Sequence, residues 1–379
     1  MKKVIFDVDG VLFSEERYYD VSGLTVWEIL FGKDYMGLAT EAEDFDAAKV
    51  TDGQIAAIRS RVYGKETLFE WLKNHGINSN WDMVHAALVT MIALMGETYR
   101  LRTGGDFLPI FCEKEQDVKR MGAELMGLPI PRAEEVLAYW ERHVPKDALG
   151  QAVFLKLSES METIFGEIPE WSKIGSAFWQ IHVDAFQAWY LGDDEFIRQK
   201  GRVPFCPGKA GFLKSEIPLA PKDAICALFQ RLKTKGFEIA VATGRTRNEA
   251  EIPFCANGWL KEFDPLYLAT STDAQEAGKL LGVAAPDKPH PFLYECAMYG
   301  RKPELYASYL SGEKKPETDD IVYVIGDSYA DILGSRAAGA QCIGVLTGLE
   351  GKRASVMWEK EKIPYVERVT DIESVIFGE

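Results

Sequence analysis

The sequence is poor in the two residue types that most often bind transition metals, with only five histidines and six cysteines among 379 residues. The histidines are too dispersed to suggest a zinc site, and no two cysteines stand close together at a metal-ligand spacing. We therefore expect the cysteines to be reduced and mostly buried thiols, as is usual in a reducing compartment.

Long apolar runs and excess positive charge are also missing. The longest apolar stretch, residues 86–95, is interrupted by Thr90 and is too short to span a bilayer. The N-terminus lacks the regions of a signal peptide, so a cytoplasmic location is expected. The net charge of −15 argues against nucleic acid or an anionic membrane as partner. An anionic substrate would need local positive charge or a bound cation.

Residues 14–206 have the pattern of helices. Apolar side chains between Val84 and Met95 recur at spacings of three, one, three, one and three, which is one face of a helix. Further helices are predicted over 133–143 and from about 172 to 197. The tryptophans and methionines of this block are interpreted as its own core rather than a ligand site.

Residues 207–379 alternate between amphipathic helices and apolar strands. A helix is predicted over 221–235, where Gly236 provides a stop. The predicted strands are residues 237–243, 265–269, 320–325 and 341–346. Such alternation implies parallel pairing with right-handed crossovers. Because the apolar run 4–6 is expected to join this sheet, we predict an α/β fold with a Rossmann-like parallel core, residues 1–13 and 207–379. A large all-helical domain, residues 14–206, is inserted after the first strand.

The first strand ends on two carboxylates. Asp7 and Asp9 follow the run 4–6, and Gly10 behind them permits a sharp turn. Open α/β folds place their chemistry at the carboxyl ends of strands, which makes this pair a candidate site. An Asp-rich turn without function is the alternative, so the partners of these acids decide the interpretation.

Two other loops offer groups that suit a phosphate. In the segment 242–245, the Thr243 hydroxyl and backbone N–H groups near Gly244 could hold an anion of that size. In the Lys-Pro-His-Pro segment 288–291, Lys288 could neutralise phosphate or bridge two carboxylates. Taken singly, the first loop is better explained as an ordinary strand-to-helix turn, and the lysine of the second as a solvated surface residue.

A third loop, Gly-Asp-Ser-Tyr-Ala-Asp at 326–331, follows an apolar strand. Helix capping explains Ser328 and Asp331, but it does not explain Asp327 at a buried strand end. Like charges on Asp327 and Asp7 would repel unless a hard divalent cation lay between them, and Mg²⁺ prefers such carboxylate oxygens.

In this order the four motifs resemble those of the haloacid dehalogenase (HAD) superfamily, in its phosphatase-like branch. By that resemblance Asp7 would be the nucleophile that forms an aspartyl-phosphate, and Asp9 the general acid and base. Mg²⁺ would be held by Asp7, Asp327 and the backbone carbonyl of Asp9. The phosphoryl group would be bound by Thr243, Gly244 and Lys288, with Ser328 and Asp331 in support. The helical block occupies the place of that family's cap, although it is larger than usual.

The resemblance implies a Mg²⁺-dependent phosphatase acting on a small phosphorylated metabolite. Asp9 argues against carbon–halogen cleavage, because that reaction has no alkoxide leaving group to protonate. Two alternatives stay open: a phosphomutase of the β-phosphoglucomutase kind, and a binding or regulatory protein with an idle core. The presence of Asp7, Asp9 and Asp327 weighs against an idle core.

The resemblance leaves the choice between two lysines, and the roles of two arginines, to be argued separately. Lys302 stands nearer the usual spacing before Asp327, whereas the sequence around Lys288 matches the family better, and we choose Lys288. Arg245 and Arg247 follow the phosphate loop, where they could reach a substrate anion or lie on the surface.

Overall fold

The computed structural model describes residues 1–38, 45–77, 79–105, 112–348 and 351–378. The chain forms two compact units, Met1–Glu16 with Leu213–Glu379 and Arg17–Phe212. We call them the α/β unit and the helical unit. The sequence placed the two junctions near residues 14 and 207, whereas the units divide after residue 16 and after residue 212.

The α/β unit is built on a six-stranded parallel sheet in the order β3-β2-β1-β4-β5-β6. The strands are β1 (Lys2–Phe6), β2 (Glu238–Ala242), β3 (Leu268–Ala269), β4 (Ile321–Gly326), β5 (Gln341–Val345) and β6 (Tyr365–Val366). This is the Rossmann-type α/β fold that the sequence predicts. Its switch point, where consecutive connections leave in opposite directions, lies between β1 and β4.

Two details of the sheet differ from the prediction. The segment 265–269 is a strand only at Leu268–Ala269, because Pro265–Tyr267 forms a 3-10 helix. The Asp264 side chain accepts the Leu266 N–H at 2.9 Å and so starts a turn rather than a strand. The two-residue strand β6 was not predicted, since so short a segment carries no periodicity.

Helices cover both faces of the sheet, because the side chains of each strand alternate between two cores. Val4 and Phe6 pack with helices α10 (Lys222–Thr234) and α11 (Arg247–Ala256), whereas Ile5 packs on the opposite face. That opposite face is covered by α12 (Ser271–Leu281), α13 (Phe292–Tyr299) and α14 (Tyr306–Ser311). Helices α15 (Tyr329–Ala338) and α16 (Ala354–Glu361) share a smaller cluster around Trp358, and α17 (Glu373–Phe377) ends the unit.

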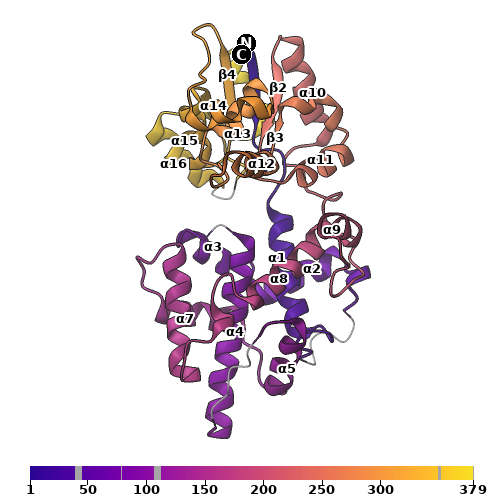
Figure 1. The fold of residues 1–379 in the computed structure, drawn as a ribbon, viewed down its shortest axis with the longest axis vertical. Helices are drawn as coiled ribbons and strands as arrows, with labels where there is room; N and C mark the ends of the chain where they lie inside the picture. The colour runs from indigo at the N-terminus through magenta and orange to yellow at the C-terminus, as the bar shows by residue number, and fades with distance from the viewer. Residues whose placement is uncertain (39–44, 78, 106–111, 349–350, 379) are drawn as a thin grey trace. The chain divides into compact units, whose positions relative to one another are not determined.

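The helical unit (Figure 1) contains α1 (Glu16–Phe31), α2 (Asp52–Tyr63), α3 (Thr67–Asn74), α4 (Asn80–Thr103), α5 (Glu115–Leu125), α6 (Ala133–His143), α7 (Gln151–Phe165), α8 (Ala177–Leu191) and α9 (Asp193–Lys200). The predicted helix 84–95 lies within α4, and 133–143 matches α6. The helix predicted from 172 to 197 is wrong at both ends. Ser176 caps α8 by accepting the Trp179 N–H, and Gly192 separates α8 from α9 at a φ of 79°.

Side-chain burial in the helical unit agrees with a self-contained core. Met83, Met91 and Met95 are buried, as are Trp171, Trp189 and Tyr190, whereas Trp179 is half-buried. All six cysteines are unpaired, but only Cys112, Cys296 and Cys342 are buried, so the expectation that most would be buried was wrong.

Within the described residues, no helix combines the length and apolar character that crossing a membrane requires.

Candidate active site

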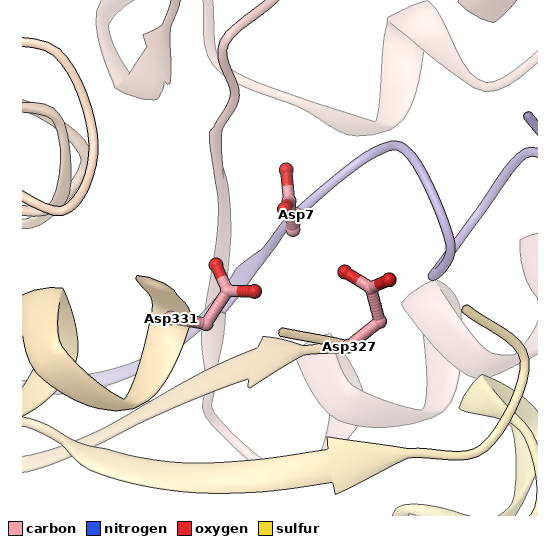
Figure 2. Close-up of side chains that lie close together, drawn as sticks. All are labelled: Asp7, Asp327 and Asp331. Carbon is pink, nitrogen blue, oxygen red and sulfur yellow. The ribbon is translucent and has the colours of Figure 1, made fainter. Parts of the chain in front are cut away.

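Three carboxylates converge at the switch point of the sheet (Figure 2). Asp7 follows β1, Asp327 follows β4, and Asp331 lies in the first turn of α15. The two strands are neighbours, and the Asp7 N–H donates to the Ile325 carbonyl at 2.9 Å. As a result each acid offers one oxygen to a group of ligand atoms within 4.8 Å of one another. We call these three residues the acidic cluster.

Lys288 ties two members of the acidic cluster together. Its Nζ lies 2.8 Å from Asp7 Oδ2 and 2.9 Å from Asp331 Oδ1. The same Asp331 oxygen accepts the Tyr294 hydroxyl at 2.8 Å, and the other accepts Ser328 Oγ at 2.7 Å. Both Asp331 oxygens are therefore occupied by this chain's own donors, which suits a residue that orients Lys288.

Lys302 has a different place. It precedes a 3-10 helix, Pro303–Leu305, and within the described ranges no ion pair or hydrogen bond joins its side chain to the acidic cluster. The geometry therefore favours Lys288 as the lysine of the site.

Burial dominates the electrostatics of the acidic cluster. It raises the pKa of Asp7 to about 7, against the opposing pull of Lys288, and Asp331 adds to the rise. Burial, together with Asp331 and Asp7, holds the pKa of Asp327 well above its usual range. Burial alone would lower the pKa of Lys288, but Asp331 and Asp7 outweigh it and raise that pKa well above normal. Three carboxyl groups thus share one lysine, and burial together with their mutual repulsion disfavours the ionised forms of Asp7 and Asp327.

Asp327 is the part of this arrangement that best fits a metal ion. Within the described residues, its carboxylate makes no hydrogen bond or ion pair. Two glycine backbones press against it: a Cβ at Gly10 would lie 2.3 Å from Asp327 Oδ2, and one at Gly348 would lie 2.0 Å from it. Hard, crowded carboxylate oxygens without donors fit Mg²⁺, and Asp7 and Asp327 are the residues that would hold it.

Asp9 does not join the acidic cluster through its side chain. Its carboxylate accepts hydrogen bonds from Arg245, with Nη2–Oδ1 at 2.6 Å and Nε at 3.1 Å from both Oδ1 and Oδ2. Arg245 Nη1 in turn lies 2.9 Å from Glu216 Oε1. Arg245 is only 3% exposed, so it is not a surface residue, and its guanidinium binds Asp9 and Glu216. We call this arrangement the Asp9–Arg245–Glu216 bridge.

The predicted phosphate loop follows β2, next to β1 in the sheet. Thr243 is fully buried, and its hydroxyl accepts the Arg245 N–H at 3.1 Å. Gly244 has open space around it, since an added Cβ would meet nothing within 4 Å. Within the described ranges, neither residue makes a hydrogen bond or ion pair with the acidic cluster.

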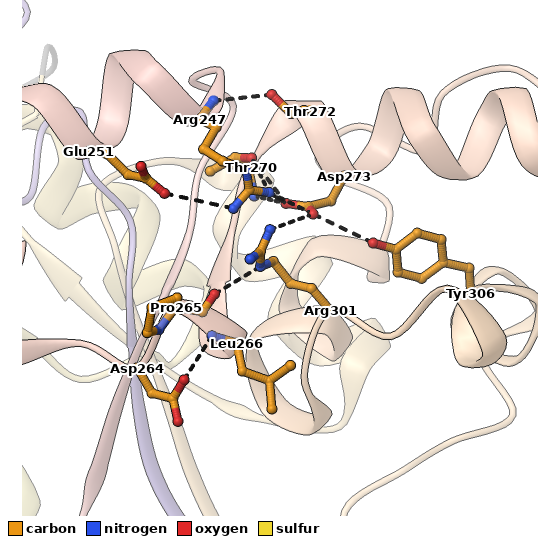
Figure 3. A network of polar contacts seen from close by, with 10 residues as sticks. All are labelled: Arg247, Glu251, Asp264, Pro265, Leu266, Thr270, Thr272, Asp273, Arg301 and Tyr306. Atoms are coloured by element: carbon orange, nitrogen blue, oxygen red, sulfur yellow. Dashed lines mark hydrogen bonds and ion pairs between the residues drawn. The ribbon is translucent and has the colours of Figure 1, made fainter.

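Arg247 belongs to a separate network at the start of α12 (Figure 3). Its Nη2 lies 2.8 Å from Asp273 Oδ1, and Arg301 Nη1 lies 3.2 Å from the same oxygen. The Thr270 N–H donates to the other Asp273 oxygen at 2.8 Å. Arg247 therefore fastens α11 to α12, and the structure places its guanidinium on Asp273 rather than on a site for substrate.

Several residues around the site were not found from the sequence. Thr347 donates to the Gly10 carbonyl at 2.6 Å, and Gly348 presses on Asp327. Because both follow β5, the rule that parallel strands end at one edge could have found them. Glu216 and Tyr294 carry no such signal, because one lies outside any strand or helix and the other lies inside α13.

The chain is similar to several known proteins. The HAD-hydrolase-like family model matches residues 286–372, and no curated protein matches. A crystal structure solved as a target of the Northeast Structural Genomics Consortium is 30% identical, with a TM-score of 0.86, and 100% of this chain and 99% of that chain are covered. The phosphatase Tt82 from Thermococcus thioreducens is 18% identical, with a TM-score of 0.43 and coverage of 94% and 98%. A phosphonoacetaldehyde hydrolase-like protein from Oleispira antarctica is 12% identical, with a TM-score of 0.39 and coverage of 100% and 91%.

The family match spans β4, α15 and β5, together with the segment that carries Lys288. The likeness to the first of these crystal structures extends over the complete chain, including the helical unit. The chain belongs to the haloacid dehalogenase-like superfamily of hydrolases.

Proposed function

We propose that this protein is a Mg²⁺-dependent phosphatase that hydrolyses a small phosphorylated metabolite through an aspartyl-phosphate. One observation carries the proposal: Asp7, at the end of β1, lies 2.8 Å from the ammonium of Lys288 and within 4.8 Å of an Asp327 oxygen. A carboxylate nucleophile, a cation for the phosphoryl oxygens and an acid for a metal are thus gathered at one strand edge.

The proposed reaction has two displacements at phosphorus. An Asp7 oxygen attacks, the ester P–O bond breaks, and the leaving oxygen takes a proton from the Asp9 carboxyl group. A water molecule then attacks the aspartyl-phosphate and gives a proton to Asp9, and the bond between phosphorus and Asp7 breaks. Lys288 would bind the phosphoryl oxygens, with Thr243 and Gly244 at the neighbouring strand end.

Asp7 and Asp327, with the Asp9 carbonyl, would hold the Mg²⁺, with Ser328 and Asp331 orienting the lysine beside them. When bound, the ion supplies positive charge that offsets the repulsion within the acidic cluster and polarises the phosphoryl group. We further propose that the helical unit is the cap that selects the leaving group. The unpaired cysteines fit a reducing cytoplasmic compartment.

The test is phosphate release from a panel of phosphorylated metabolites, with Mg²⁺ or with EDTA. We expect metal-dependent release that falls at least ~10³-fold in Asp7→Asn, because the nucleophile is lost. Lys288→Met should lose activity as well, whereas the matched control Lys302→Met should keep it.

Three results would contradict the proposal. Full activity in EDTA would exclude the metal, and full activity of Asp7→Asn would exclude the nucleophile. Conversion of one sugar phosphate into its isomer without net release would identify a phosphomutase instead.

A further inference from the structure

The Asp9–Arg245–Glu216 bridge has a feature that phosphate binding does not explain. The guanidinium uses Nε and Nη2 for Asp9 and Nη1 for Glu216, so its planar fork holds two carboxylates at once. The Arg245 side chain is 1% exposed and the Glu216 side chain 0%, whereas that of Asp9 is 29% exposed. Two members of the bridge are therefore buried, and the reacting member is open to solvent.

Glu216 is held in place by the segment on which it lies. The Ser14 N–H donates to the Ile217 carbonyl at 2.8 Å, and the Leu219 N–H donates to the Leu12 carbonyl at 3.0 Å. An antiparallel bridge pairs Phe13 with Pro218. The chain around Glu216 thus runs beside the turn that carries Asp9, and its carboxylate reaches Arg245 from within the protein.

This placement has an electrostatic consequence. A buried guanidinium without a counter-charge is expensive, and it would bind any nearby carboxylate strongly. Because Glu216 supplies a buried counter-charge, Asp9 can leave Arg245 without exposing an uncompensated cation in the interior. Asp9 must move in this way to reach a leaving oxygen, since Arg245 occupies both of its carboxylate oxygens.

We propose that Glu216 is a positioning residue that lets Asp9 exchange Arg245 for the leaving group. The proposal rests on the phosphatase function above. In the step concerned, the Asp9 O–H bond breaks and its proton goes to the ester oxygen. The electron pair of the breaking P–O bond stays on that oxygen, and phosphorus gains its new bond from Asp7. Glu216 contributes no atom to this step and acts only through Arg245.

Glu216→Gln tests this role. Without the counter-charge, Arg245 should retain Asp9, and proton donation should slow. We expect kcat/KM for alkyl phosphates, whose leaving groups need a proton, to fall about 10-fold to 100-fold. The value for p-nitrophenyl phosphate, whose leaving group needs none, should change less than about 3-fold. The Mg²⁺ concentration for half-maximal activity should stay unchanged.

The matched control is Glu249→Gln. Arg245 Nη1 donates to the backbone carbonyl of Glu249 at 3.1 Å, while the Glu249 carboxylate accepts the Thr246 N–H at 2.9 Å. In the Glu249→Gln variant, kcat/KM should depend on the leaving group as it does in the wild type. A double variant, Arg245→Gln with Glu216→Gln, removes both buried charges and should recover most of the selective loss. The double variant also keeps the proposal testable if Glu216→Gln alone does not fold.

An equal loss on alkyl and p-nitrophenyl esters would overturn the proposal, as would a double variant no better than the single one. If the wild type released no phosphate from any ester, the phosphatase function would fail. A crystal structure of Glu216→Gln would then still test the positioning role, because Asp9 is expected to stay bound to Arg245, and an Asp9 carboxylate released from Arg245 would contradict it.

Discussion

The two units of the protein treat buried charge in opposite ways. In the α/β unit, the acidic cluster sets three carboxylates against the single ammonium of Lys288. In the helical unit, the buried Glu28 and Lys209 pair one to one at 2.7 Å. An unbalanced buried cluster costs stability, so it is expected where chemistry or a metal needs it. A balanced buried pair needs no ligand to explain it.

The surroundings of the two groups sharpen this comparison. Glu28 also accepts the Trp189 Nε1–H at 3.0 Å, and the Lys209 ammonium lies 4.9 Å from the centre of the same indole ring. The whole arrangement is satisfied within the helical unit. Asp327, by contrast, has no donor within the described part of the chain. The presence of hydrogen-bond and ion-pair partners, more than the depth of burial, distinguishes a structural charge from one that awaits a ligand.

The largest effect is expected for Asp327→Asn. Phosphate release should fall at least ~10²-fold, because a metal-binding carboxylate is lost. In EDTA the same variant should melt about 2 °C or more above the wild type, because burial disfavours the ionised form of Asp327 and holds its pKa well above the usual range, and the amide removes this cost. Activity assays and thermal unfolding measure the two effects on one sample.

The control for this variant is Asp319→Asn, which removes an exposed acid from the same unit and should change neither quantity. If Asp327→Asn were active, or less stable than the wild type in EDTA, the cluster would be a structural element and the comparison would fail.

A somewhat smaller effect is expected from breaking the balanced pair. Lys209→Met leaves Glu28 buried without its cation, and should lower the free energy of unfolding by about 3–5 kcal/mol. Chemical denaturation measures this loss. The double variant Glu28→Leu with Lys209→Met should recover most of it, since no charge stays uncompensated. A Lys209→Met protein of normal stability but without activity would show that this pair, too, serves function.

Much of the fold was predictable because the central strands of a parallel sheet are apolar on both faces. The runs that became β1, β2, β4 and β5 were found in this way, and the acids at their ends followed from the same rule. The rule fails for short edge elements, where Leu268–Ala269 and Tyr365–Val366 leave too few residues for a pattern.

The partners of the site residues were less predictable. Arg245 could be a surface or a substrate-binding residue by sequence alone, because its burial depends on Glu216, a residue 29 positions away. Such a pair is set by tertiary packing and leaves no local periodicity. The helix break at Gly192 was missed for a related reason: the close approach of the Ala210 backbone, 2.5 Å from where a Cβ would lie, becomes visible only in three dimensions.

The smallest expected effect is a difference between the two units in how the free energy of unfolding depends on pH. In the helical unit His85 is buried, with its Nδ1 3.0 Å from Nε2 of His182 and its Nε2 2.9 Å from the Ser172 carbonyl. Burial lowers the pKa of His85 to about 4. The unfolded chain, with an ordinary histidine pKa of about 6.5, binds more protons between these values. Stability from this group is therefore complete above about pH 6.5 and is lost as the pH falls.

Glu295 of the α/β unit should behave in the opposite way. It is fully buried, and burial raises its pKa to about 7, so the folded state binds more protons than the unfolded chain between about 4.5 and 7. Its contribution is present at low pH and is lost as the pH rises. Denaturation of His85→Gln, Glu295→Gln and wild type at pH 5, 6 and 7 in EDTA tests both signs. The His85 contribution should increase with pH by at most about 1.4 kcal/mol per unit, and that of Glu295 should decrease. Equal signs would mean that both units bury their titratable groups alike, and the contrast would then be confined to the acidic cluster.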